Sequence, residues 1–148
     1  KDQPSNVLID GVFELRYLEN RGSAFGMMQN KLMILIPVTV VVTLFILYLF
    51  FKKLPATRHF FWLNAVAVLF FAGAIGNFID RVRQGYVVDF FYFSLINFPI
   101  FNVADIYVTA AAFLLIFLCL FYYKEEDFEQ IFPSDSSRQH SSEKKDND

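Results

Sequence analysis

The sequence predicts an all-α integral membrane protein with three transmembrane helices and a small external β-sheet. Of its 148 residues, 55% are hydrophobic and 19% aromatic, a composition that fits a membrane protein better than a soluble domain. Uncharged apolar runs cover residues 32–51, 60–79 and 106–123, each long enough or nearly so to cross a hydrocarbon core of about 30 Å. A soluble chain of this length could not supply a shell to cover three such helices.

The expected sheet comes from two segments outside these runs. Phe13, Leu15 and Tyr17 alternate with charged residues, which is the period of a half-buried strand. Residues 86–91 are rich in β-branched and aromatic side chains, and Gly85 before them suits a turn. We expect these two strands to form a sheet that rests on the outer membrane surface, near the helix ends.

Charge placement predicts the orientation in the membrane. The short loop between the first two runs carries three basic residues: Lys52, Lys53 and Arg58. Short basic loops stay in the cytoplasm, so residues 1–30 and 81–105 should lie outside and the tail should lie in the cytoplasm. Net charge is only −2 and decides little.

The chain therefore divides into three parts. Residues 1–30 form an external segment with a strand and a polar collar, residues 31–123 form the membrane domain, and residues 124–148 form a disordered cytoplasmic tail rich in Ser, Asp and Lys. An external N-terminal segment needs a preceding membrane helix to deliver it. Because the sequence begins at Lys1 without a signal peptide, we expect that an upstream span is missing.

Two aspartates stand where a membrane chain rarely carries acid. Asp89 interrupts an aromatic and β-branched run, and Asp105 falls in the first turn of the third span if Asn102 caps that helix. A carboxylate in hydrocarbon costs about 2.5–3.5 kcal/mol on insertion scales, and two carboxyls that share one proton can activate water. The alternatives are a helix-capping role for Asp105 and an ion pair of Asp89 with Arg81 or Arg83.

Further polar and small residues gather at the same end of the second span. Asn77, Asp80 and Arg81 share a helix face, either as part of a site or as a helix end reaching for the headgroups. Gly73 and Gly76 lie on the same stretch, where small residues let another helix or a substrate backbone approach closely.

Residues 20–26, Asn-Arg-Gly-Ser-Ala-Phe-Gly, join the first strand to the first span. They are either a turn before a helix or a polar collar near the acids. Cys119 is the only cysteine, and His59 and His140 fall on the inner side. This distribution gives no metal-ligand cluster, and no cofactor is expected.

Four motifs occur in a fixed order: Asn20-Arg-Gly-Ser-Ala-Phe, Gly76-Asn-Phe-Ile-Asp-Arg81, Val87-Val-Asp-Phe90 and Phe101-Asn-Val-Ala-Asp105. Together with the hydropathy, they resemble lipoprotein signal peptidase, or signal peptidase II, over residues 5–123. The resemblance implies a monomeric aspartic endopeptidase of the bacterial inner membrane with four spans and an active site at the outer face. It implies membrane-lipid contact, no nucleic acid, and diacylglyceryl-modified prolipoproteins as substrates, cleaved just before the lipidated cysteine.

The resemblance also assigns residues. Asp89 and Asp105 match the catalytic acids, and the supporting positions are Asn20, Gly22, Gly73, Asn77, Asp80, Arg81, Asn102 and Ala104. The sequence departs from the family pattern by lacking the first span, by Ser23 in place of a usual Ala, and by Ile106 where Ser is common.

A non-catalytic membrane scaffold or an ion-binding subunit using the same acids is the alternative function. An ion-binding subunit needs polar groups spread through the bilayer depth, whereas here they gather at one face, with Asn64 as the main exception. Because a helix N-terminus stabilises negative charge, we expect Asp105 to be the base and Asp89 the acid.

Overall fold

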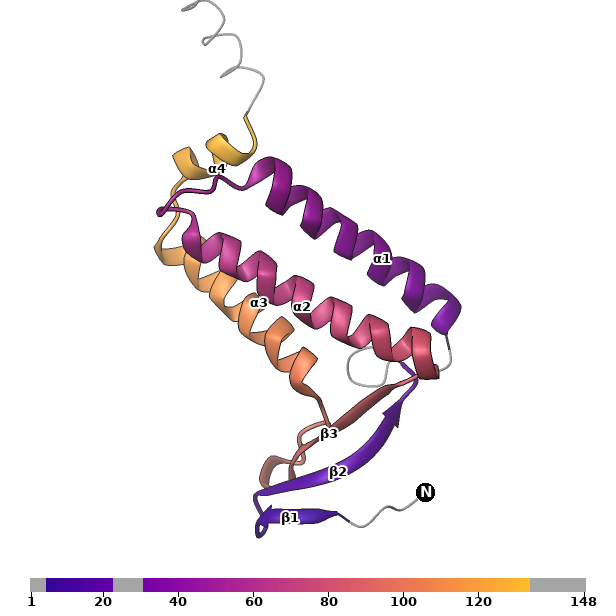
Figure 1. Ribbon diagram of the computed structural model, residues 1–148. Helices are drawn as coiled ribbons and strands as arrows, with labels where there is room; N and C mark the ends of the chain where they lie inside the picture. The colour runs from indigo at the N-terminus through magenta and orange to yellow at the C-terminus, as the bar shows by residue number, and fades with distance from the viewer. Residues whose placement is uncertain (1–4, 23–30, 134–148) are drawn as a thin grey trace, which may run out of the picture.

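The computed structural model describes residues 5–22 and 31–133. In this part of the chain, three helices are long and apolar enough to cross a membrane: α1 (Leu32–Tyr48), α2 (Phe61–Gln84) and α3 (Val103–Phe121). A π-helix, Leu49–Lys53, extends α1. Figure 1 shows α2 and α3 side by side, a small sheet at one end of the helices and a short helix, α4, at the other. The predicted mainly helical membrane fold is confirmed.

One helix end differs from the predicted spans because local backbone geometry, which hydropathy does not report, decides it. α2 continues past residue 79 to Gln84 and ends at Gly85, whose φ of 81° lies in the left-handed region that favours glycine. The predicted Asn102 cap is confirmed: α3 begins at Val103, three residues before the apolar run, and the Asn102 side chain accepts a hydrogen bond from the Asp105 N–H.

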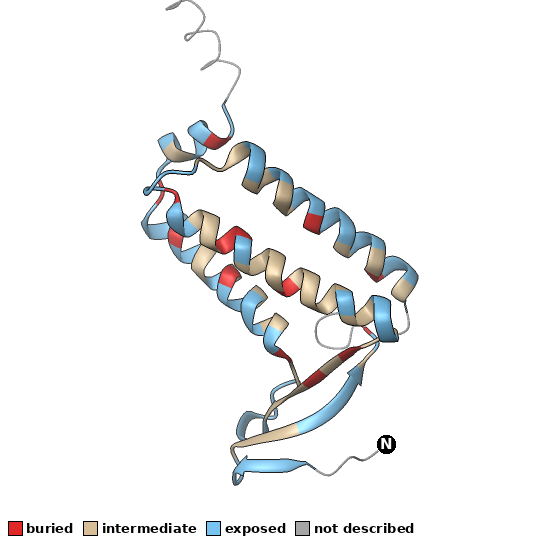
Figure 2. Ribbon diagram, viewed as in Figure 1, coloured by how far each residue is buried: buried red, intermediate tan, exposed pale blue. Residues whose placement is uncertain are grey.

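The surface of the helices is apolar over most of its length. Buried residues are scattered in Figure 2, and the helices expose large side chains such as Met33, Val41, Phe113 and Phe121. A helix that is hydrophobic on nearly all sides belongs in lipid or in a large core. These side chains therefore suit a hydrocarbon environment.

The sheet is antiparallel, with strand order β1-β2-β3: β1 is Asn6–Ile9, β2 is Phe13–Asn20 and β3 is Val87–Phe93. The two predicted strands are present and longer than expected. The sequence reasoning missed β1, whose four residues show no alternation between apolar and polar side chains. In the pairing of β2 with β3, Leu18 lies opposite Asp89 and Asn20 opposite Val87.

The segment after α3 is ordered further than predicted. Residues Glu125–Ile131 form α4, so the prediction of a disordered tail beginning at 124 fails for these residues. Ile131 is buried in a cluster with Phe60 and Tyr123, and Asp127 pairs with His59 at 2.8 Å. This apolar contact and the Asp127–His59 contact hold the helix against the end of the bundle, while residues from 134 lie outside the described part.

Candidate active site

A backbone bridge between β3 and the start of α3 builds the site. The Phe91 N–H donates to the Phe101 carbonyl at 2.8 Å, and the Phe101 N–H donates to the Phe91 carbonyl at 3.1 Å. Alternate residues of a strand share a face, so Asp89 lies on the same face of β3 as Phe91. Asn102 follows Phe101 directly. The bridge therefore brings Asp89 next to the first turn of α3.

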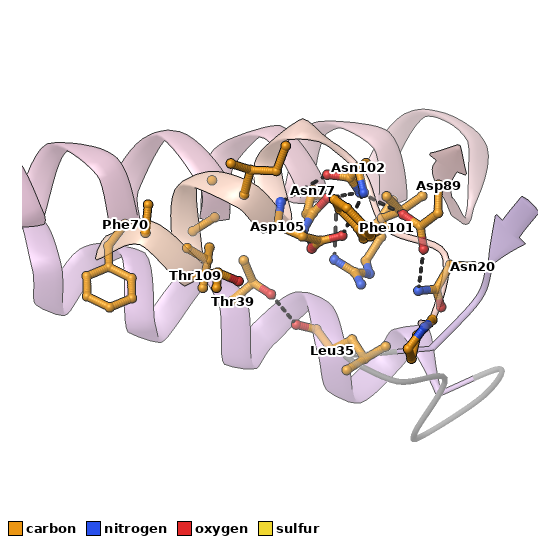
Figure 3. Close-up of a pocket in the computed structure, with 18 of the residues that line it drawn as sticks. Asn20, Leu35, Thr39, Phe70, Asn77, Asp89, Phe101, Asn102, Asp105 and Thr109 are labelled. Atoms are coloured by element: carbon orange, nitrogen blue, oxygen red, sulfur yellow. Dashed lines mark hydrogen bonds between the residues drawn. The ribbon is translucent and has the colours of Figure 1, made fainter. Parts of the chain in front are cut away.

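Asn102 connects the two acids. Its side-chain Nδ2 donates to Asp89 Oδ1 at 2.7 Å and to Asn77 Oδ1 at 3.1 Å, while its Oδ1 accepts the Asp105 N–H at 3.1 Å. The Asn102 N–H donates in turn to Asp105 Oδ2 at 3.1 Å, which completes a capping box. One buried asparagine thus contacts both carboxyl groups, that of Asp89 through its side chain and that of Asp105 through its backbone N–H (Figure 3).

Asp89 is almost completely buried, with 1% of its surface exposed. Its second oxygen accepts the Asn20 amide N–H at 2.8 Å. Burial raises the pKa of Asp89, the nearby charge of Asp105 adds to the rise, and the amide donors of Asn20 and Asn102 oppose it. The ion pair considered as an alternative is not formed: among the described residues, the pairs within 4.0 Å do not include Asp89.

Asp105 both caps α3 and faces the site. Its Oδ1 accepts the Asn77 amide N–H at 3.0 Å, and its position in the first helical turn favours a negative charge. The capping alternative is therefore true but incomplete, because the same carboxyl also lines the groove described below. Within residues 5–22 and 31–133, no group of three or more His, Cys, Asp or Glu side chains is placed to hold a metal ion.

Gly73 lets α2 approach α3 closely enough for Asn77 to reach Asp105. A Cβ at Gly73 would lie 2.6 Å from the Ala104 carbonyl oxygen and 2.6 Å from Val108 Cγ2. Asn77 stands one turn after Gly73, and Asp105 follows Ala104. The close helix packing predicted from the small residues is present here, and it sets the distance between these two polar side chains.

Arg81 connects the predicted polar collar, which begins at Asn20, to the site. Its Nη2 donates to the Gly22 carbonyl at 2.8 Å and its Nη1 to the Asn77 carbonyl at 3.4 Å, while the Gly22 N–H donates to Asn20 Oδ1 at 2.9 Å. The guanidinium thus turns inward instead of only reaching for headgroups. Asp80 makes no side-chain hydrogen bond to another described residue and does not line the groove. Residues 23–26 of the predicted collar, including Ser23, lie outside the described residues.

The acids stand at one end of a groove of about 810 Å³ between α1 and the α2–α3 pair. Leu35 and Thr39 of α1 lie across the groove from Asp105, and Phe70 and Thr109 line it farther along (Figure 3). Sequence reasoning missed these four lining residues. The threonines were the available signal, because each places a hydroxyl inside an otherwise apolar run.

The comparisons with known proteins agree on one family. The family model of signal peptidase (SPase) II matches residues 1–121. The lipoprotein signal peptidase of Caldanaerobacter subterraneus subsp. tengcongensis is 46% identical over 118 residues, which is 79% of this chain and 77% of that protein. The lipoprotein signal peptidase of Clostridioides difficile is 43% identical over 115 residues, covering 77% of this chain and 72% of that protein.

Two solved structures share the fold. One is titled a bacterial membrane enzyme structure by the in meso method at 2.3 Å resolution. It aligns with a TM-score of 0.75 and 32% identity over 84% of this chain and 77% of that one. The second, of the same kind at 1.9 Å resolution, aligns with a TM-score of 0.69 and 34% identity over 83% of this chain and 79% of that one. With a family model matching most of its length and relatives above 40% identity, this chain belongs to the signal peptidase II family of membrane proteases.

Proposed function

We propose that the protein is an intramembrane aspartic endopeptidase that removes the signal peptide from diacylglyceryl-modified bacterial prolipoproteins. It would cut the peptide bond just before the lipidated cysteine. One observation supports the aspartic mechanism: Asn102 hydrogen-bonds to the carboxyls of both Asp89 and Asp105, and both acids line the same largely apolar groove. The substrate class is that named for the relatives, lipoprotein signal peptidases.

The two acids differ in a way that suits opposite roles. Asp89 is buried, its pKa is raised, and it holds the proton that the pair shares. Asp105 sits at the N-terminus of α3, where the helix favours the ionised form. Asp105 is therefore the general base and Asp89 the general acid.

The chemistry follows from these roles. Asp105 takes a proton from water, and the resulting hydroxide attacks the scissile carbonyl carbon, while Asp89 gives its proton to the carbonyl oxygen. The tetrahedral diol then collapses. The C–N bond breaks, Asp105 gives its proton to the leaving amine, and a hydroxyl proton returns to Asp89 as the new carboxylic acid forms. The dyad ends as it began, with one proton, and these steps require no metal or cofactor.

The groove supports a lipid-embedded peptide substrate better than an ion. Its walls are mostly aliphatic and aromatic side chains, which suit the apolar segment of a signal peptide. Amide N–H groups of Asn20, Asn77 and Asn102 donate to the carboxyl oxygens of the two acids. These are the oxygens that a bound cation would need as ligands. This arrangement disfavours the ion-binding alternative.

A lipidated test peptide distinguishes the proposed protease from a binding scaffold. We expect cleavage of a peptide that carries diacylglyceryl-cysteine, with mass spectrometry placing the cut before that cysteine. The matched peptide with an unmodified cysteine should be cut at least about tenfold more slowly, because it loses the binding energy of two acyl chains. Intact lipidated peptide after prolonged incubation would support the scaffold instead.

We also propose that the acids face the outer side and that the tail is cytoplasmic. The basic loop with Lys52, Lys53 and Arg58 supports this orientation. In a Cys119→Ala background, an impermeant thiol reagent added from outside should label a cysteine introduced at Gln84 and miss one at Ala56. The reverse labelling pattern would contradict the orientation and place the acids on the cytoplasmic side.

A further inference from the structure

A second cavity lies at the end of the helices opposite the acids. It has a volume of about 450 Å³ and is lined by Arg58, Phe61, Trp62 and Tyr122. Arg58 belongs to the loop before α2, Phe61 and Trp62 begin α2, and Tyr122 follows α3. The cavity therefore lies where two spans reach the membrane interface, the depth at which Trp and Tyr side chains are enriched.

The Arg58 guanidinium forms no ion pair with the part of the chain that the structure describes. Among the described residues, no carboxylate lies within 4.0 Å of it. The nearby acid Asp127 is already occupied, since it accepts from His59 Nε2 at 2.8 Å and from the Lys124 N–H at 2.9 Å. His59 also stacks on Tyr122, with ring centroids 5.5 Å apart. The contact with His59 thus engages one of the four acids of α4, Asp127, while the stacking of His59 on Tyr122 fixes one wall of the cavity.

The aromatic side chains give the cavity both apolar surface and hydrogen-bond donors. Trp62 is 49% exposed and Phe61 58% exposed, and their rings meet edge to face with centroids 5.2 Å apart. Trp62 brings an indole N–H and Tyr122 a hydroxyl, both of which can donate to an anion. The planar guanidinium of an arginine, next to such donors, can form two hydrogen bonds to a phosphate. The exposed rings can contact the glycerol and the upper acyl region of a lipid.

We infer that this cavity binds the headgroup of an anionic phospholipid, with Arg58 as the phosphate ligand. The charge, the donors and the apolar rings all fit an anionic headgroup, and the volume lies within the usual range for a small-molecule site. A soluble phosphate would use Arg58 but leave the aromatic walls unoccupied. The inference does not depend on the proposed proteolytic mechanism, because the site lies at the other end of the spans.

The test measures lipid binding by the full chain in detergent, by native mass spectrometry and by the midpoint of thermal unfolding. Phosphatidylglycerol should bind and raise the midpoint more than phosphatidylcholine does. Arg58→Gln should weaken phosphatidylglycerol binding about fivefold, the effect of one basic residue at an anionic surface. The matched variant Arg83→Gln, in the last turn of α2 at the opposite end of the spans, should bind like the unaltered chain.

Three results would overturn the inference. The first is equal binding of phosphatidylglycerol and phosphatidylcholine, which would leave only an aromatic contact with the interface. The second is an equal loss in the Arg58 and Arg83 variants, which would mean general attraction of the anionic lipid to positive charge. The third is an Arg58-dependent rise of the midpoint with inorganic phosphate as large as that with the lipid, which would identify a free-phosphate site.

Discussion

Cleavage of a lipidated peptide should fall by at least about 10³-fold when either Asp89 or Asp105 is replaced by asparagine. Asparagine keeps the shape of the carboxyl but cannot exchange a proton. Both oxygens of each acid accept an N–H, so the NH2 of the asparagine would face one of these donors and the unfolding midpoint should fall modestly. The main loss should appear in kcat, with the protein still folded. Single-turnover cleavage measured alongside thermal unfolding checks both parts.

Asp10→Asn is a suitable control, because this exposed acid lies in the β1–β2 turn away from the groove. Its cleavage rate should be unchanged. The pH profile adds a second test: kcat/KM should fall as pH rises through the raised pKa of Asp89, because the acid then loses its proton. Substantial cleavage by either Asn variant would remove the dyad mechanism.

Gly73→Ala should be the most damaging single-methyl change in the membrane domain. The added Cβ would lie 2.6 Å from the Ala104 carbonyl oxygen and 2.6 Å from Val108 Cγ2, so α3 must move. Overpacking of this kind costs about 1–3 kcal/mol, and the shift occurs next to Asp105. We expect a lower unfolding midpoint together with a cleavage rate reduced by about tenfold or more.

Gly76→Ala is the control, because it adds the same methyl group to α2 where the contact with α3 is less close. Its Cβ would meet only Ala104 Cβ, at 3.3 Å, so the loss of stability should be clearly smaller. Adding Val108→Ala to Gly73→Ala should restore part of the stability, since it removes the side-chain clash but leaves the backbone oxygen in place. If Gly73→Ala is as stable and active as the unaltered chain, the close approach of α2 to α3 does not set the site geometry.

Much of the fold was predictable because hydropathy and strand alternation report it directly. The three spans, the strands of residues 13–17 and 86–91, and the Asn102 cap all follow from local pattern. β1 is too short to show a period, and the end of α2 depends on the left-handed backbone of Gly85. α4 depends on an apolar contact of Ile131 with residues distant in sequence, which no local pattern contains.

The site was predictable in its residue types but not in its connections. Acids at two positions and asparagines at three more indicate a polar site, yet the sequence does not show that Asn102 contacts both carboxyls. That contact depends on the bridge between Phe91 and Phe101, a pairing of two backbones set by tertiary structure. The groove wall supplied by α1 was missed because most of its lining residues are aliphatic, as in any membrane helix, and the Thr39 hydroxyl was its one polar signal.

Asn102 has two roles, one in the fold and one in the site, and this limits which substitutions could make the protein resistant to an inhibitor. The Asn102 side chain both caps α3 and hydrogen-bonds to the Asp89 carboxyl, and Gly73 is likewise fixed by the packing that positions Asp105. Substitutions that weaken a drug by altering these contacts would also weaken the fold or the catalyst. A compound whose affinity rests on the Asp89–Asn102–Asp105 cluster should therefore select few viable resistant variants, whereas one that relies on the aliphatic wall of α1 should select many.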